Sequence, residues 1–376
     1  MPSSGGAARG SVIVHVFGKT DVGRTREHNE DAFVVADLTA DDASLQPSVR
    51  THTAGPRGSL FMVADGMGGA AAGEIASEMA TSIVLRELRR DWMAHPHPSS
   101  DSFAAALKHA AVVANAEINA YAANHAEYRG MGTTATMAGL FGDTIYVAQV
   151  GDSRAYLVRD GVARQITKDQ SLMQKLVEAG EITEEEAELS ERRNIILQAL
   201  GPEASVKIDL THQKLRRDDV LVLCSDGLSG QVSRDQIGEV VHDEPDLMVV
   251  CKRLIDLANS AGGPDNITVI AARFEGDGLE FTTADDDVGH RVFPLAEAGN
   301  TPPMGVDRLL DDESQRVTMP IHAVTRDTVP VAADEERPLV SEARRARGRM
   351  VQRLLLGALV VAVVAAIAWW VNKVRS

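Results

Sequence analysis

Residues 60–74 read LFMVADGMGGAAAGE, and this stretch decides the fold because it joins a buried strand to a helix. Residues 60–64 form an apolar run of strand length that ends at Asp65. Glycines 66, 68 and 69 follow, and an Ala-rich helical pattern begins at about Gly73. Glycine lets the backbone take positive φ and approach a ligand closely. The pattern predicts a carboxylate at a sheet edge that water and ions can reach, or, in the plainer alternative, a strand-to-helix turn with a capping Asp.

The composition limits the function classes. The chain of 376 residues can hold one large domain or two ordinary ones, and its net charge is −16. An excess of acid argues against a nucleic-acid-binding surface, which needs a basic footprint. It suits a protein that gathers cations at grouped carboxylates, although a solvated acidic surface would give the same excess. Cys224 and Cys251 lie in apolar neighbourhoods and are typical of buried thiols in a reducing compartment. Neither begins a Cys-x5-Arg loop, which argues against a cysteine-nucleophile phosphatase.

Residues 11–275 carry the patterns of a globular domain with both strands and helices. Ile75, Met79 and Ile83 recur at helical spacing after the opening stretch. Two amphipathic pieces separated by Gly180 predict a helix–turn–helix over 168–194, and residues 37–59 resemble a long surface connection. Strands are expected at 11–17, 32–36, 60–64, 133–140, 144–150, 154–159, 219–224 and 267–273, and further helices at 101–121, 233–242 and 246–261.

The two ends differ from this domain. Residues 1–10 are small and polar, predict a flexible N-terminus and carry no signal peptide. Residues 276–343 lack periodicity and carry acidic clusters, so they are expected to form a flexible, acidic, disordered linker. Residues 354–371 then form an uncharged run of 18 residues, long enough for a transmembrane helix.

The charges around this run give it a direction. The basic juxtamembrane segment 344–353 contains five arginines, whereas the short tail 372–376 contains only Lys373 and Arg375. This asymmetry places the N-terminal side in the cytoplasm, and Trp369 and Trp370 suit the far interface. A buried core helix is the alternative, but the run has no core to join. The expectation is a single-pass protein of the cell membrane with a cytoplasmic catalytic domain.

Acidic residues recur beside small residues at predicted strand edges. Glu30-Asp31, Asp65-Gly66, Asp226-Gly227 and Asp265-Asn266 lie at such edges, and Gly151-Asp152 lies in a strand–strand turn. Carboxylates brought together at neighbouring strand ends would repel strongly without a counter-charge. Mg²⁺ and Mn²⁺ prefer oxygen ligands, and zinc is disfavoured because no His-x3-His or Cys-x2-Cys pair is present. Each motif alone fits an ordinary Asp-Gly turn, but together they favour a site for hard divalent cations.

The order and spacing of six motifs resemble the metal-dependent Ser/Thr protein phosphatases, the protein phosphatase 2C family, in their compact bacterial form. The resemblance covers about 11–275 and implies an α+β fold, a four-layer α-β-β-α sandwich of two antiparallel sheets flanked by helices. It also implies that 168–194 is a flap that influences substrate choice; a packed subdomain without functional role is the alternative. The motifs are Arg26-x2-Asn29-Glu30-Asp31, Val63-Ala64-Asp65-Gly66-Met67-Gly68-Gly69, Gly130-Met131-Gly132-Thr133-Thr134, Gly151-Asp152-Ser153-Arg154, Ser225-Asp226-Gly227-Leu228 and Asp265-Asn266-Ile267-Thr268.

The resemblance implies two tightly held Mn²⁺ or Mg²⁺ ions. Asp65 would bridge them, with Glu30 and the carbonyl of Gly66 completing one site. Asp226 and Asp265 would hold the other ion. Two such cations lower the pKa of a bridging water, so that it attacks phosphorus in line, and they screen the charge of the phosphoester.

Four further residues receive roles from the resemblance. Asp31 would orient metal-bound water, and Asp152 would join Asp226 around a third, weaker ion, with Asn194 near it. Arg26 would clamp the substrate phosphate, because its planar fork fits two phosphate oxygens. A surface arginine paired with a neighbouring glutamate is the alternative for Arg26.

One position departs from the family pattern. Many eukaryotic members carry a histidine where this chain has Met67, so the general acid is left open. His28 is a candidate by sequence proximity alone, and an exposed loop histidine is the plainer reading of it.

The expected function is hydrolysis of phosphoserine and phosphothreonine in proteins. The expected partners are phosphorylated proteins, in particular bacterial Ser/Thr kinases and their substrates. Two alternatives remain open: a regulator phosphatase dedicated to one partner protein, and an inactive module that binds phosphoproteins. The intact set of carboxylates and Arg26 argues against the inactive module.

Overall fold

The computed structural model describes residues 10–44, 50–190, 192–295 and 324–325. All of them belong to one compact unit, Met1–Val329, whereas the unit Pro330–Ser376 lies outside these ranges. The predictions for residues 1–9, for the linker at 296–323 and 326–343, and for residues 344–353, 354–371 and 372–376 therefore fall on parts of the chain that the structure does not describe. Within the described ranges, none of the helices is long and apolar enough to cross a membrane.

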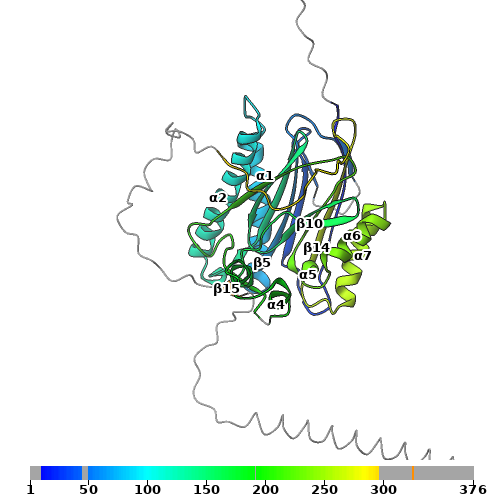
Figure 1. The fold of residues 1–376 in the computed structure, drawn as a ribbon. Helices are drawn as coiled ribbons and strands as arrows, with labels where there is room; N and C mark the ends of the chain where they lie inside the picture. The colour runs from blue at the N-terminus through cyan, green and yellow to red at the C-terminus, as the bar shows by residue number, and fades with distance from the viewer. Residues whose placement is uncertain (1–9, 45–49, 191, 296–323, 326–376) are drawn as a thin grey trace, which may run out of the picture. The chain divides into compact units, whose positions relative to one another are not determined.

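Two antiparallel sheets form the centre of the domain (Figure 1). A two-residue pairing of β11 (Ile195–Ile196) with β15 (Val324–Thr325) lies apart from both. The six-stranded sheet has the order β10 (Val162–Gln165), β9 (Arg154–Arg159), β13 (Val220–Cys224), β14 (Ile267–Glu275), β1 (Ile13–Asp21), β4 (Arg50–Thr53). The seven-stranded sheet has the order β12 (Asp209–Lys214), β8 (Thr144–Val150), β7 (Ala135–Phe141), β5 (Ser59–Met67), β2 (Asp31–Asp37), β3 (Asp42–Ser44), with β6 (Gly132–Thr133) paired to β5.

Helices cover the outer face of each sheet. α1 (Ala70–Glu87) and α2 (Ser100–Asn124) share an apolar core with the seven-stranded sheet, and α6 (Arg234–Asp243) and α7 (Leu247–Ser260) share another with the six-stranded sheet. A third core fills the space between the sheets. This arrangement confirms the predicted α+β sandwich of helices and two antiparallel sheets (Figure 1). The remaining helices are η1 (Leu88–Trp92), η2 (Ala126–Tyr128), α3 (Leu172–Glu178), α4 (Glu184–Glu188) and α5 (Asp226–Ser229).

The stretch that opened the sequence analysis behaves as expected. All nine residues of β5 are buried, because alternate side chains enter different cores: Leu60 and Met62 the outer one, Phe61 and Val63 the one between the sheets. The turn after it depends on two glycines with positive φ, 116° and 90° at residues 68 and 69. Side chains rarely adopt that conformation, so glycine is needed there. α1 begins at Ala70, slightly before the predicted start.

Three features differ from the sequence-based expectation. The segment 37–59, expected to be a long surface connection, contains β3 and β4, which extend the edges of the two sheets. β10 and β12 also occupy segments for which no strand was predicted, because their residues are largely polar. The packed domain also continues past 275, where the acidic linker was expected to begin. Leu279 is buried, and Phe293 and Leu295 pack against the core beneath α1 and α2. Burial of apolar side chains at irregular spacing leaves no periodic pattern from which to predict it.

Candidate active site

A cavity of about 900 Å³ contains most of the predicted site residues in its wall. α3 and α4 border it on one side, and α5 and the first turn of α6 on the other. Five of the predicted residues line it: Arg26, Asp152, Asn194, Asp226 and Asp265. The other four, Glu30, Asp31, Asp65 and Gly66, join this group through backbone pairing and hydrogen bonds.

The strand pair β2–β5 brings two of the predicted carboxylates together. Asp31, the first residue of β2, lies opposite Asp65 on β5. The amide of Gly66 donates to the carbonyl of Glu30 at 3.1 Å. A Cβ on Gly73 would lie 2.3 Å from Oε2 of Glu30, so this glycine lets the glutamate carboxylate lie against the start of α1. The opening stretch thus contributes Asp65, Gly66 and the space for Glu30.

Asp31 is held by two hydroxyl groups. Its Oδ2 accepts hydrogen bonds from Ser225 Oγ and Thr268 Oγ1, each at 2.7 Å. Its Oδ1 is buried and makes no hydrogen bond to the described residues. A buried oxygen normally has a partner, so this atom is available to a group that the protein itself does not supply.

The electrostatics of Asp31 reflect the same crowding. Burial raises the pKa of its carboxyl group to about 7, against the lowering effect of the two hydroxyl groups. The charges of Asp265 and Asp226 raise this pKa further. Negative charge is therefore concentrated where β2, β14 and α5 meet, and a cation bound there would be strongly favoured.

Arg26 lies half-buried at the cavity wall and donates from Nη2 to Oδ2 of Asp265 at 3.0 Å. The loop that carries Arg26 is fixed by Asn266. Oδ1 of Asn266 accepts a hydrogen bond from the amide of Glu30 at 2.8 Å. Nδ2 of Asn266 donates to the carbonyls of His28 at 2.9 Å and Val22 at 3.0 Å. One side chain thereby positions both the arginine loop and Glu30 beside Asp265.

The remaining predicted residues reach the site from other elements. Asp65 and Asp152 are each only 5% exposed, and the backbone amide of Asp65 donates to Oγ1 of Thr134 at 3.0 Å. Gly151 has φ 99° and donates its amide to Oε1 of Gln170 at 2.9 Å, which fixes the turn that carries Asp152. Asn194 is an exposed residue just before β11. The proximity of Asp152 and Asn194 to one cavity agrees with the predicted third ion but does not test it.

The comparisons with known proteins decide the family. The model of the family described as Protein phosphatase 2C matches residues 26–267. The chain belongs to this family. It is 37% identical over 257 residues to the serine/threonine phosphatase stp of Listeria monocytogenes, covering 68% of this chain and 94% of the relative. It is 38% identical over 266 residues to the serine/threonine protein phosphatase PstP of Mycobacterium tuberculosis, covering 70% of this chain and 46% of that protein.

Solved structures of bacterial serine/threonine phosphatases share the fold of this chain. A crystal structure of the Mycobacterium tuberculosis phosphatase PstP/Ppp matches with a TM-score of 0.59 at 36% identity, covering 70% of this chain and 99% of that one. The catalytic domain of PstP in complex with two manganese ions matches with a TM-score of 0.57 at 35% identity, covering 70% and 99%. The predicted family and its class of enzyme are thus confirmed, and a manganese-bound member of the family agrees with the predicted choice of cofactor. The roles of individual residues remain predictions.

The donor atoms at the cavity suit the cofactor of the 2C phosphatases. Carboxylates and a backbone carbonyl are the ligands that Mg²⁺ and Mn²⁺ prefer. The orphaned Oδ1 of Asp31 is a second indication, since it faces no protein donor among the described residues.

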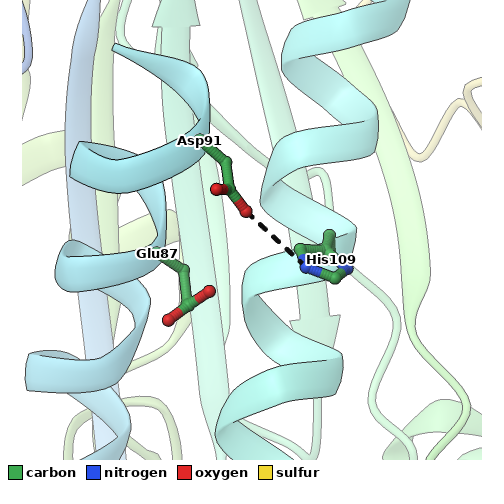
Figure 2. Close-up of side chains that lie close together, drawn as sticks. All are labelled: Glu87, Asp91 and His109. Atoms are coloured by element: carbon green, nitrogen blue, oxygen red, sulfur yellow. Dashed lines mark ion pairs between the residues drawn. The ribbon is translucent and has the colours of Figure 1, made fainter. Parts of the chain in front are cut away.

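A separate acidic group lies away from this cavity. It consists of Glu87 at the end of α1, Asp91 in η1 and His109 in α2, and Figure 2 shows their side chains between these helices. Their potential ligand atoms lie within 4.8 Å of one another. None of the three lines the cavity. Glu87 is ion-paired with Arg86 and Arg90, which already neutralise it.

The structure shows the surroundings of Met67, which replaces the family's histidine, and of His28, the candidate for the general acid. Met67 is 2% exposed and packs against Ile196 and Ala199, so it supports the segment after the flap. His28 is exposed and uses its backbone carbonyl to bind Asn266, in agreement with the plainer reading of it as a loop histidine.

Sequence reasoning quoted Ser225, Asn266 and Thr268 as parts of motifs but gave them no role. The structure shows that the two hydroxyl residues hold Asp31 and that Asn266 fixes the arginine loop. Their signal was their place beside Asp226 and Asp265. Gly73 was seen only as the start of a helix, although its lack of a side chain makes room for Glu30.

Proposed function

We propose that this chain is a metal-dependent phosphatase that removes phosphate from phosphoserine and phosphothreonine in proteins. The observation that carries the proposal is the setting of Asp31. Two neutral hydroxyl groups hold one of its oxygens, the other oxygen is buried without a hydrogen bond to the described residues, and two more carboxylates act on it. Such an arrangement is costly unless a cation shares it.

The residues that would hold the ions follow from the family motifs. Glu30, Asp65 and the Gly66 carbonyl would hold one ion, and Asp65, Asp226 and Asp265 the other. A third, weaker ion would lie between Asp152 and Asp226, with Asn194 nearby. The chemistry that such ions supply is a water of lowered pKa together with neutralisation of the phosphoester charge.

The chain's own residues then bind and orient. Arg26 would offer its guanidinium to two phosphate oxygens, and its ion pair with Asp265 keeps it beside the ligand carboxylates before substrate arrives. Asp31 would accept a hydrogen bond at Oδ1 from the attacking water, while Ser225 and Thr268 fix its orientation. The half-buried position of Arg26 lets it reach the substrate phosphate without leaving the cavity wall.

Hydrolysis of a phosphothreonine peptide by the full chain tests this function. Activity should require Mn²⁺ or Mg²⁺ and stop when a chelator is added. Arg26→Lys keeps the charge but loses the fork, so KM for the peptide should rise by about tenfold. Arg253→Lys changes an exposed arginine of α7 that does not line the cavity, and it should leave KM unchanged. A rate that is insensitive to the chelator would refute the proposal.

The two alternative functions give different results in this assay. A phosphatase dedicated to one partner would hydrolyse generic peptides poorly but one phosphoprotein well. An inactive binding module would bind the phosphopeptide without releasing phosphate. No observation on the described residues favours either alternative.

We further propose that residues 354–371 anchor the enzyme in the cell membrane, with the catalytic domain in the cytoplasm. The support is the uncharged run of 18 residues and the excess of arginine before it. Anchoring would raise the effective concentration of substrates in the same membrane, among which Ser/Thr kinases and their targets are our candidates. The full chain should stay in the membrane fraction after alkaline extraction, and a chain ending at 343 should not. Release of both by alkali would contradict the anchor.

A further inference from the structure

The chain after β14 forms a strap, residues 276–295, that connects the two sheets. Gly276 has φ 103°, and a Cβ there would lie 2.2 Å from the carbonyl oxygen of Ser11, so only glycine fits the turn. The strap then follows the free edge of the other sheet. The amide of His212 on β12 donates to the carbonyl of Arg291 at 2.9 Å, and the amide of Phe293 donates to the carbonyl of Leu210 at 2.9 Å. The yellow part of the ribbon in Figure 1 follows this path.

Ionic and apolar contacts hold the strap in place. Arg216 donates to both carboxylate oxygens of Asp286, from Nε at 2.7 Å and from Nη2 at 2.5 Å. The ring of Phe293 meets the rings of Tyr146 and His212 edge-on, with centroids 5.2 and 5.3 Å apart. A two-point ion pair at Asp286 and a partly buried ring at Phe293 fix both ends of the stretch between them.

That stretch forms part of the cavity wall. Val288 and His290 line the same cavity as Arg26 and Asp226. Val288 also packs against the core between the sheets, so its position is fixed from behind. Burial lowers the pKa of His290, and the charge of Lys168 lowers it further, so both favour the neutral form of the ring. The strap therefore adds an uncharged surface to a cavity that is otherwise rich in charge.

The size of the cavity indicates what this surface would meet. About 900 Å³ is space for a drug-sized ligand, much more than one phosphorylated side chain needs. A small aryl phosphate needs only the carboxylate end, whereas a peptide extends along the wall. The family model matches residues 26–267, so the strap lies outside the part that the model matches.

We propose that the strap is a specificity element, in which Val288 and His290 bind an uncharged residue that flanks the phosphorylated one in the substrate. This inference rests on the proposed phosphatase function. It assigns no part in the hydrolysis itself to the strap, so it concerns the affinity for the peptide rather than the chemical step.

The test compares two substrates with the full chain in Mn²⁺. In the double variant Val288→Ala, His290→Ala, KM for a phosphothreonine peptide with apolar flanking residues should rise by about tenfold, because an apolar contact of this size contributes that much. Its kcat, and both constants for p-nitrophenyl phosphate, should stay the same. Val292→Ala is the matched control, because Val292 lies in the same strap but is 68% exposed and does not line the cavity.

Each outcome decides between the two proposals. An unchanged peptide KM in the double variant would overturn the strap proposal, and so would an equal loss on both substrates, which would indicate a general structural effect. The thermal unfolding midpoint of each variant separates these cases. Absence of metal-dependent hydrolysis by the unmodified chain would instead overturn the proposed function, and the strap proposal with it.

Discussion

Buried carboxylates in this protein are neutralised in two different ways. In the cavity, Asp31 is hydrogen-bonded by neutral hydroxyl groups, which satisfy an oxygen without removing its charge. At the far end of the six-stranded sheet, Asp219 is paired with Arg159 at 2.8 and 2.6 Å, so both hydrogen bonds and charge are supplied. Both carboxylates are buried, so burial does not distinguish them. The hydrogen-bonding partner does: a carboxylate held by neutral hydroxyl groups still needs a cation, whereas one paired with arginine has a structural role.

Glu87 is a structural carboxylate like Asp219, although other potential metal ligands lie beside it. It forms a possible ligand cluster with Asp91 and His109, yet Arg86 and Arg90 already pair with it (Figure 2). A cluster of acidic residues is thus a weak indication of a metal when guanidinium groups share it. The two kinds of carboxylate should therefore respond differently to the same loss of charge.

The largest effect should come from a ligand carboxylate. Asp226→Asn keeps the shape but removes a charge that the ions need, so kcat with saturating Mn²⁺ should fall by at least about 10³-fold, the upper range for one preorganised stabilising group. Asp91→Asn makes the same change in the Glu87 cluster and should leave the rate within about twofold. Initial rates over a Mn²⁺ titration measure both. Equal losses in the two variants would show that the carboxylates of the cavity and of the Glu87 cluster do not differ in function.

The second effect should fall on stability alone. Arg159 and Asp219 are 7% and 1% exposed. Arg159→Met fills the space but leaves the carboxylate buried without its partner, so the free energy of unfolding should fall by about 3–5 kcal/mol. Adding Asp219→Asn should recover part of the loss. Urea titrations give these values, and the Mn²⁺ concentration for half-maximal rate should not change; a shift in that concentration would link this pair to the site.

Much of the fold was predictable because its signals are local. The alternating or continuous apolar runs gave β5, β8 and β13, and the glycines at 68 and 69 gave the turn into α1. β12 was missed because its side chains are mostly polar and its partners lie far away in the chain. The strap was missed for a similar reason, since single residues such as Leu279 are buried without any period.

The site was predictable at the level of motifs but not of contacts. The acidic pairs at strand ends identified Asp31, Asp65 and Asp226, and the cavity and strand pairing bring them into one region. No pattern in the sequence could show that Thr268, some 240 residues away from Asp31, donates to it. Such hydrogen bonds depend on how β14 and β2 meet from opposite sheets, which only the folded arrangement determines.

The third effect tests this hydroxyl support. Thr268→Val removes the donor to Asp31 but keeps the side-chain shape, so kcat should fall by about tenfold, at the low end for a group that orients a metal site. Thr268→Ser keeps the hydroxyl and should retain most of the rate. Metal affinity and kcat measured together for the two variants give the answer. If valine and serine behave alike, the hydroxyl does not support the site.

The smallest effect concerns a carboxylate paired with arginine at the surface. Hydrogen bonds from Arg216 and the Thr283 amide hold the pKa of Asp286 well below its usual range. A lowered folded-state pKa stabilises the fold above the unfolded-state value of about 3.8, and this contribution is lost as the pH falls below it. Asp286→Asn should therefore lower the urea midpoint slightly and evenly from pH 7 to pH 5, and the difference from the unmodified chain should shrink as the pH falls below 4. Asp285→Asn alters the exposed neighbour and should give a curve that follows the unmodified chain throughout.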